Sequence, residues 1–138
     1  MRENLFRGKR AFTKEWVEGS LLVFMDDAAI VPCETALVHY ISPKTVGQYI
    51  GQPDKNGKKI FEGDIGRYKQ TDGAKRNGKP ITCIGKVVYN AKTASFAVES
   101  NDETGCKYFD YFPIKDFEVI GNIHDHPELL EANGNGNL

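Results

Sequence analysis

Residues 45–65 read TVGQYIGQPDKNGKKIFEGDI and contain the chain's strongest turn signals between short β-like segments. At the centre of this stretch, Asp54-Lys55-Asn56-Gly57-Lys58 places an Asn-Gly pair between two β-like segments, 45–50 and 60–61. Asn and Gly both tolerate positive φ, so this pair is the strongest short-range signal for a hairpin with a type I′ turn. The Glu62-Gly63-Asp64 triplet predicts a second tight turn before another strand at 65–68.

Many other short β-like segments lie on both sides of this hairpin. They are residues 14–24, 28–31, 36–41, 81–89, 95–100, 106–112 and 117–120. The polar segment 70–80 is predicted to be a mobile loop, and 126–132 a short helix, because Pro127 suits the first helical position. Many short strands with frequent turns predict one compact β-barrel or sandwich. We expect a single domain over residues 1–130 and a flexible tail at 131–138.

Composition excludes several classes of protein. The chain has 138 residues, 18 Lys+Arg and 19 Asp+Glu, so its net charge of −1 excludes a uniformly basic nucleic-acid binder. The longest apolar run, Leu21–Met25, is too short to span a membrane. No signal-like segment opens the chain, so we expect a soluble protein that is not secreted. Cys33, Cys83 and Cys106 form no C-x-x-C pair and are expected to be small, mostly buried thiols.

Charge is distributed unevenly along the chain. Residues 55–79 hold eight basic side chains against three acidic ones, which makes them a candidate anion-binding stretch or a solvated loop. The candidate anion-binding residues are Lys55, Lys58, Lys59, Lys75, Arg76 and Lys79. Residues 99–131 are acidic and aromatic, which fits core packing or a surface for a protein partner. The candidate partner surface consists of Tyr108, Asp110, Tyr111, Asp116 and Glu118.

Two clusters could carry chemistry, and each has a structural interpretation beside the chemical one. Glu62 and Asp64 could form an acid/base pair, but the glycine between them favours a turn in which a carboxylate accepts backbone N–H bonds. His124 and His126 could meet one metal ion, but their place before Pro127 favours helix entry. We therefore expect no catalytic, cofactor-binding or metal-binding residues, with these two clusters as the only exceptions.

The residues that carry the fold also resemble a known family. Residues 45–65 resemble the signature of the YopX family of phage and prophage proteins, T-V-G-Q-[FY]-T-G-L-x-D-K-N-G-K-x-I-[FY]-E-G-D-I. Phe6-Arg7-Gly8-Lys9 and Trp16–Leu21 resemble its opening. The end of the family's sequence is similar to two stretches of this chain. They are residues 117–123, Phe-Glu-Val-Ile-Gly-Asn-Ile, and residues 127–130, Pro-Glu-Leu-Leu. The departures are small: Ile50 stands where Thr is usual, and His126 stands where Asn often precedes the proline.

The resemblance implies a mainly β protein, a small barrel of the Src-homology-3-like roll type with extra β-strands and a short C-terminal helix. It also implies phage or prophage origin and a place in the bacterial host cytoplasm, and it brings no established activity or cofactor. We expect a non-enzymatic binding module that contacts a host or phage protein through residues 99–131. The alternative is a nucleic-acid-associated protein that uses the basic 55–79 stretch. No membrane is expected as a partner, and self-association through strand edges stays open.

Overall fold

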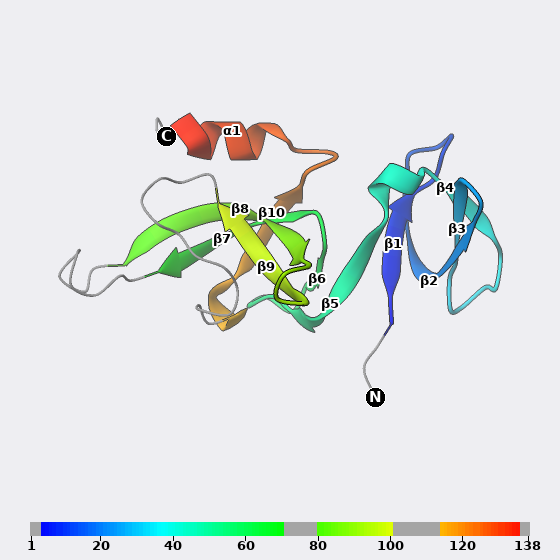
Figure 1. The fold of residues 1–138 in the computed structure, drawn as a ribbon, viewed down its shortest axis with the longest axis horizontal. Helices are drawn as coiled ribbons and strands as arrows, with labels where there is room; N and C mark the ends of the chain where they lie inside the picture. The colour runs from blue at the N-terminus through cyan, green and yellow to red at the C-terminus, as the bar shows by residue number, and fades with distance from the viewer. Residues whose placement is uncertain (1–3, 71–79, 101–113, 136–138) are drawn as a thin grey trace. The chain divides into compact units, whose positions relative to one another are not determined.

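The computed structural model describes residues 4–70, 80–100 and 114–135, which form antiparallel β-sheet and one short helix (Figure 1). The chain divides into two compact units, Met1–Gly51 and Gln52–Leu138. The mainly β prediction is confirmed, while the single domain predicted over 1–130 stays a prediction. No helix in the described ranges is both long enough and apolar enough to cross a membrane.

The first unit is an antiparallel sheet with the strand order β4-β3-β2-β1-β5. Its strands are β1 (Phe6–Lys9), β2 (Trp16–Phe24), β3 (Asp27–Val31), β4 (His39–Ile41) and β5 (Gly47–Pro53). A 3₁₀ turn, η1 (Pro43–Thr45), precedes β5. The side chain of Thr45 fixes this turn, because its Oγ1 donates to the Ser42 carbonyl at 2.6 Å and accepts the Lys9 N–H at 2.9 Å.

A small core lies on one face of this sheet. Ala28, Ile30 and Ile41 are buried there. The partly buried side chains that pack against them are Phe6, Val17, Leu21 and Val46. A Cβ at Gly8 would overlap the Ile41 side chain, so only glycine lets β1 pass so close to the residue that ends β4.

The second unit is built on a four-stranded antiparallel sheet with the order β10-β7-β8-β9. Its strands are β7 (Asp64–Gln70), β8 (Ile81–Asn90), β9 (Ser95–Ser100) and β10 (Glu118–Asn122). The short strand β6 (Lys59–Phe61) pairs with β5, the turn η4 (Ile114–Asp116) precedes β10, and the helix α1 (Glu128–Asn135) packs against β8 (Figure 1). Among the described residues of this unit, the largest apolar side chains with less than 2% exposure are Tyr68, Phe117, Ile60, Ile65, Val87 and Val98, and Phe61 is buried at 2%.

The predicted barrel does not close in the part of the chain that the structure describes. Each unit has an open sheet, and β4 approaches the end of β1 through one isolated bridge, Arg10 with Ile41. A single bridge cannot make the continuous ladder of hydrogen bonds that a closed barrel needs. The Src-homology-3-like roll therefore stays a prediction.

Most predicted elements are present with shifted ends. The apolar segments at 28–31 and 81–89 are strands, and the helix predicted at 126–132 begins at Glu128. Strand β1 was not predicted, because Phe6–Lys9 is too short and too polar to signal a strand alone. The loop predicted at 70–80 and the strand predicted at 106–112 lie largely or wholly outside the described residues.

The cysteines differ from the expected buried thiols. Cys33 is exposed and free in the connection after β3, so the prediction of burial is wrong for this residue. Cys83 has no exposed surface on β8, but it is disulfide-bonded instead of a free thiol. Cys106 lies outside the described residues.

Candidate functional site

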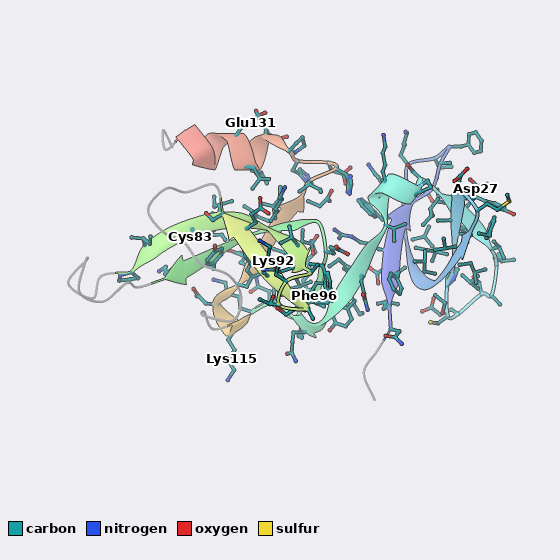
Figure 2. All side chains as sticks on the ribbon, viewed as in Figure 1. Asp27, Cys83, Lys92, Phe96, Lys115 and Glu131 are labelled. Atoms are coloured by element: carbon teal, nitrogen blue, oxygen red, sulfur yellow. The ribbon has the colours of Figure 1, made fainter. Side chains whose placement is uncertain are left out.

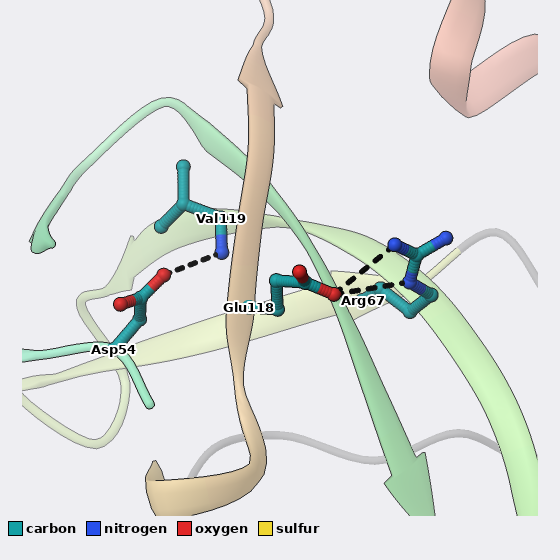
Figure 3. A network of polar contacts seen from close by, with 4 residues as sticks. All are labelled: Asp54, Arg67, Glu118 and Val119. Carbon is teal, nitrogen blue, oxygen red and sulfur yellow. Dashed lines mark hydrogen bonds and ion pairs between the residues drawn. The ribbon is translucent and has the colours of Figure 1, made fainter. Parts of the chain in front are cut away.

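The hairpin at residues 54–58 is organised by the carboxylate of Asp54, which is only 6% exposed. Its Oδ1 accepts the backbone N–H groups of Asn56 at 2.8 Å and Lys58 at 2.9 Å. Its Oδ2 accepts the N–H of Val119 in β10 at 2.9 Å (Figure 3). One side chain therefore shapes its own loop and attaches that loop to a strand 65 residues further along the chain.

The hairpin itself is confirmed, but its predicted type I′ turn is wrong. The Asp54 carbonyl accepts the Gly57 N–H at 3.0 Å, and the Asp54 N–H donates to the Lys58 carbonyl at 2.7 Å. Gly57 has φ +84°, whereas Asn56 is absent from the positive-φ residues of the described chain. Type I′ needs positive φ at both positions, so this is a three-residue loop that ends in a left-handed glycine. The carboxylate of Asp54 favours this wider loop because both of its Oδ1 bonds lie within it.

The hydrogen bonds of Asp54 also set its protonation. Burial raises the pKa of this carboxyl group, but hydrogen bonds from the backbone of Val119, Lys58 and Asn56 lower it, and the charge of Lys58 lowers it further. The net effect is a pKa below the ordinary value for aspartate. Asp54 is therefore a charged structural acceptor at neutral pH.

The Glu62-Gly63-Asp64 triplet forms the turn that its glycine predicted. Asp64 is 1% exposed, and its Oδ2 accepts the Phe61 N–H at 2.8 Å. Gly63, with φ +93°, donates its N–H to the Val87 carbonyl and accepts the Ile123 N–H, both at 2.9 Å. The triplet thus joins β8 to the segment after β10, and the Asp64 carboxylate accepts a bond from its own turn.

The two histidines lie in a turn that leads into α1. The Oδ1 atom of Asn122 accepts the N–H groups of His124 at 3.0 Å and Asp125 at 2.9 Å. The Nδ1 atom of His126 accepts the Asn122 N–H at 3.3 Å, which occupies one ring nitrogen within the turn. Within the described ranges, no group of three or more His, Cys, Asp and Glu side chains is placed to hold a metal ion.

The described members of the predicted partner surface bind their own neighbours. The Asp116 Oδ2 atom accepts the Lys69 N–H at 2.6 Å. Glu118 forms an ion pair with Arg67 at 3.0 Å, across the β10–β7 ladder (Figure 3). Tyr108, Asp110 and Tyr111 lie outside the described residues, so this surface stays a prediction.

Only half of the predicted anion-binding residues fall within the described chain. Lys55, Lys58 and Lys59 are exposed on and beside the hairpin loop. The other three, Lys75, Arg76 and Lys79, lie outside the described residues. The hairpin therefore presents a compact group of lysines on a loop that Asp54 holds in place.

Sequence reasoning missed an apolar surface on the first unit. The register pairs Leu22 with Ala29 and Ala29 with Tyr40, so these residues form one row across β2, β3 and β4. Phe24 follows on the same face of β2 and contacts Tyr40 edge to face, with ring centroids 6.0 Å apart. We call these four residues the outer apolar face, because they lie opposite the core residues Leu21, Ile30 and Ile41.

Three of the four residues of the outer apolar face are exposed. Leu22 is 45% exposed, Phe24 41% and Tyr40 59%, while Ala29 between them has no exposed surface. Other exposed apolar side chains of this unit are Phe12, Val23, Met25, Leu37 and Val38. Phe12, Val38 and Tyr40 also line a small hollow of about 180 Å³ beside β4. The signal was present in the sequence, because the longest apolar run includes Leu22 and Phe24, whose side chains point away from the core.

The fold and these contacts define a small antiparallel β protein whose signature residues hold its own backbone together. A family model described as YopX protein matches residues 5–131, and this chain belongs to the YopX family. The resemblance predicted from residues 45–65 is therefore confirmed over nearly the whole chain.

A solved structure has the same fold. It is described as the crystal structure of protein EF1440 from Enterococcus faecalis, and it is 24% identical, with a TM-score of 0.55. The match covers 94% of this chain and 99% of that chain, and at this identity it shows the fold alone. No curated protein matches this chain.

Proposed function

We propose that this chain is a non-enzymatic, phage- or prophage-encoded binding module that contacts a host or phage protein. The observation that carries the proposal is the outer apolar face. Antiparallel sheets with one face on a core usually expose a polar second face. Here the second face of β2–β4 carries Leu22, Phe24 and Tyr40 around Ala29, and contiguous exposed apolar surface is typical of sites where another molecule docks.

The size of the exposed aromatic surface supports a protein partner. An aromatic side chain carries roughly 150–250 Å² of surface. With 41% of Phe24 and 59% of Tyr40 exposed, the pair leaves about one whole aromatic side chain in water. Aromatic residues at the centre of an interface are the side chains that contribute most to protein–protein affinity.

The contacts of the chemical candidates favour a binding role over catalysis. The Asp64 carboxylate accepts a backbone bond inside a turn, and the His126 ring accepts another at helix entry. Both side chains have evident structural roles. An enzymatic role would require an activity that an Asp64→Asn variant loses while it stays folded.

Site-specific photo-crosslinking in bacterial cells tests the proposal. A photo-crosslinking amino acid replaces Tyr40 in one variant and, as a matched control, Tyr89 in another, because Tyr89 is also exposed, at 51%, but lies on β8 in the second unit. We expect an adduct of defined mass at position 40 and none of that mass at position 89. Equal adducts at both positions, or none at position 40, would refute docking on this face.

A second candidate function rests on the hairpin lysines. Lys55, Lys58 and Lys59 are exposed on and beside a loop that Asp54 holds in one conformation, which suits phosphate contacts. Fluorescence anisotropy with labelled single- and double-stranded DNA and RNA tests this role at low and physiological salt. Binding that survives physiological salt and is lost in a Lys58→Ala/Lys59→Ala variant would support it. An absence of binding at low salt would exclude it.

A further inference from the structure

At the β2–β3 turn, the charged side chains beside the outer apolar face are negative. Asp27 lies directly opposite Phe24 on the same side of the sheet, and Asp26 precedes it in the turn. Both side chains are exposed. Asp27 is labelled beside this hairpin in Figure 2. A partner with acidic side chains here would meet like charges, and a basic one would meet opposite charges.

Most basic side chains near the start of this unit are engaged with other groups. Arg7 and Lys9 lie over the Trp16 ring, with the guanidinium carbon 4.6 Å and the Lys9 Nζ atom 5.6 Å from the ring centroid. Arg10 forms an ion pair with Glu15 at 3.6 Å. The exposed carboxylates of Asp26 and Asp27, by contrast, lie beside Phe24 at the turn end of the outer apolar face.

The width of the face suits a single segment. Three adjacent strands span two strand spacings, about 10 Å in all, which is close to the diameter of one helix with its side chains. Helices and sheets are the elements that bury an apolar sheet face in folded proteins. The row from Leu22 to Tyr40 is therefore wide enough for one apolar stripe of a partner.

We propose that the outer apolar face binds an apolar segment of a partner protein that carries lysine or arginine at the end lying over Asp26 and Asp27. This proposal rests on the proposed function, because it names the partner chemistry of the same face. The apolar side chains supply the contact, and the two aspartates select basic segments over acidic ones.

Selection from a displayed library of random 16-residue peptides tests the proposal. The full chain is the target. Peptides that also bind a Tyr40→Glu variant are discarded, because they bind elsewhere on the chain. We expect the enriched peptides to combine an apolar stripe with an excess of Lys and Arg over Asp and Glu. Circular dichroism and Trp16 fluorescence establish that the variant is folded, and a milder Tyr40→Gln variant replaces it if it is not.

Affinity measurements on one enriched peptide then show how much its charge contributes to binding. A version with each Lys or Arg replaced by Glu should bind at least tenfold more weakly at low salt. An Asp26→Asn/Asp27→Asn variant should bind the basic peptide about fivefold more weakly, as expected for two exposed ion pairs. Both differences should shrink in 0.5 M salt, because exposed charges are then screened over a few ångströms. A Tyr89→Glu control should leave the affinity unchanged.

The other outcomes separate the two proposals. Peptides without a basic excess that still need Tyr40 would overturn the charge selection and leave the docking face in place. An absence of any enrichment that depends on Tyr40 would refute both. A dimer in sedimentation velocity that Tyr40→Glu dissociates would assign the face to a second copy of this chain and overturn the inferred partner.

Discussion

Replacing Asp54 should loosen the second unit, and the size of the effect follows from its contacts. In an Asp54→Ala variant, the N–H groups of Asn56, Lys58 and Val119 all lose their acceptor. Asn56 and Lys58 are exposed, so water replaces the carboxylate there at a cost of about 0.5–1.5 kcal/mol each. Val119 is half-buried, and an N–H without an acceptor there costs about 1–3 kcal/mol. These contributions sum to about 2–6 kcal/mol, so we expect a loss of about 4 kcal/mol in the free energy of unfolding.

An Asp54→Asn variant tests the geometry more closely than alanine does. The two carboxylate oxygens accept on opposite sides, one from the loop and one from β10. An amide has a single acceptor oxygen, so its NH₂ group must face an N–H group on one of the two sides. Asparagine should therefore recover at most half of the stability that alanine loses, although it is nearly the same size as aspartate.

The measurement must follow the second unit. Trp16 is the only tryptophan and lies in the first unit, so its fluorescence does not report on Asp54 directly. Urea unfolding followed by circular dichroism gives the free energy, and hydrogen exchange gives the local effect at Val119. An Asp26→Asn variant, which changes an exposed turn aspartate, should change stability by less than about 0.5 kcal/mol. An Asp54→Asn variant as stable as the parent, with unchanged exchange at Val119, would refute the reasoning.

The hydrogen bonds of Asp54 also determine how the free energy of unfolding depends on pH. Because the pKa of Asp54 in the folded state lies below its unfolded value of about 3.9, its contribution is present above pH 4. That contribution is lost as pH falls through the folded-state pKa. The stability difference between the parent chain and Asp54→Asn should therefore be constant near neutral pH and shrink below pH 4. A difference that grows on acidification would contradict the direction of the pKa shift.

Three further substitutions probe the second unit. Gly66→Ala places a Cβ inside the Phe117 ring, so we expect a loss of about 3 kcal/mol in urea unfolding, partly restored by adding Phe117→Leu. Arg67→Ala removes the surface ion pair with Glu118 and should cost less than about 1 kcal/mol in the same assay. Asn122→Ala removes the acceptor at helix entry and should cost about 1–2 kcal/mol, with a weaker helical signal in circular dichroism.

Local signals in the sequence predicted the elements but not the long-range contacts. The hairpin at 54–58 and the turn at 62–64 follow from glycines and turn formers that act over a few residues. The role of Asp54 depends on Val119, and no rule of spacing connects positions so far apart. The turn type was wrong for a local reason, because the Asp54 carboxylate accepts two N–H bonds within the loop and the Asn-Gly pair does not reveal that role.

The sequence predicted the strand that carries the outer apolar face, but it could not predict that this face is exposed. The run Leu21–Met25 was correctly assigned to a strand, and strand periodicity places Leu21 and Leu22 on opposite faces. Periodicity cannot say whether the second face is covered, since that depends on what packs against it. The predicted surface at 99–131 drew on composition alone, and two of its described acidic residues, Asp116 and Glu118, bind Lys69 and Arg67 of their own unit.

The residues of the family signature and the residues of the outer apolar face do not overlap. Asp54, Gly63 and Asp64 of the signature bind backbone groups, so the signature specifies the fold. Phe24 and Tyr40 lie outside the blocks that resemble the family. Their exchange for other exposed side chains should change binding at this face and cost only about 0.5–1.5 kcal/mol of stability for the lost Phe24–Tyr40 ring contact, whereas changes at Asp54 should cost more stability and leave binding unchanged. If Tyr40→Gln destabilised the first unit by several kcal/mol without altering binding, the face would be structural, and the separation of fold from recognition would fail.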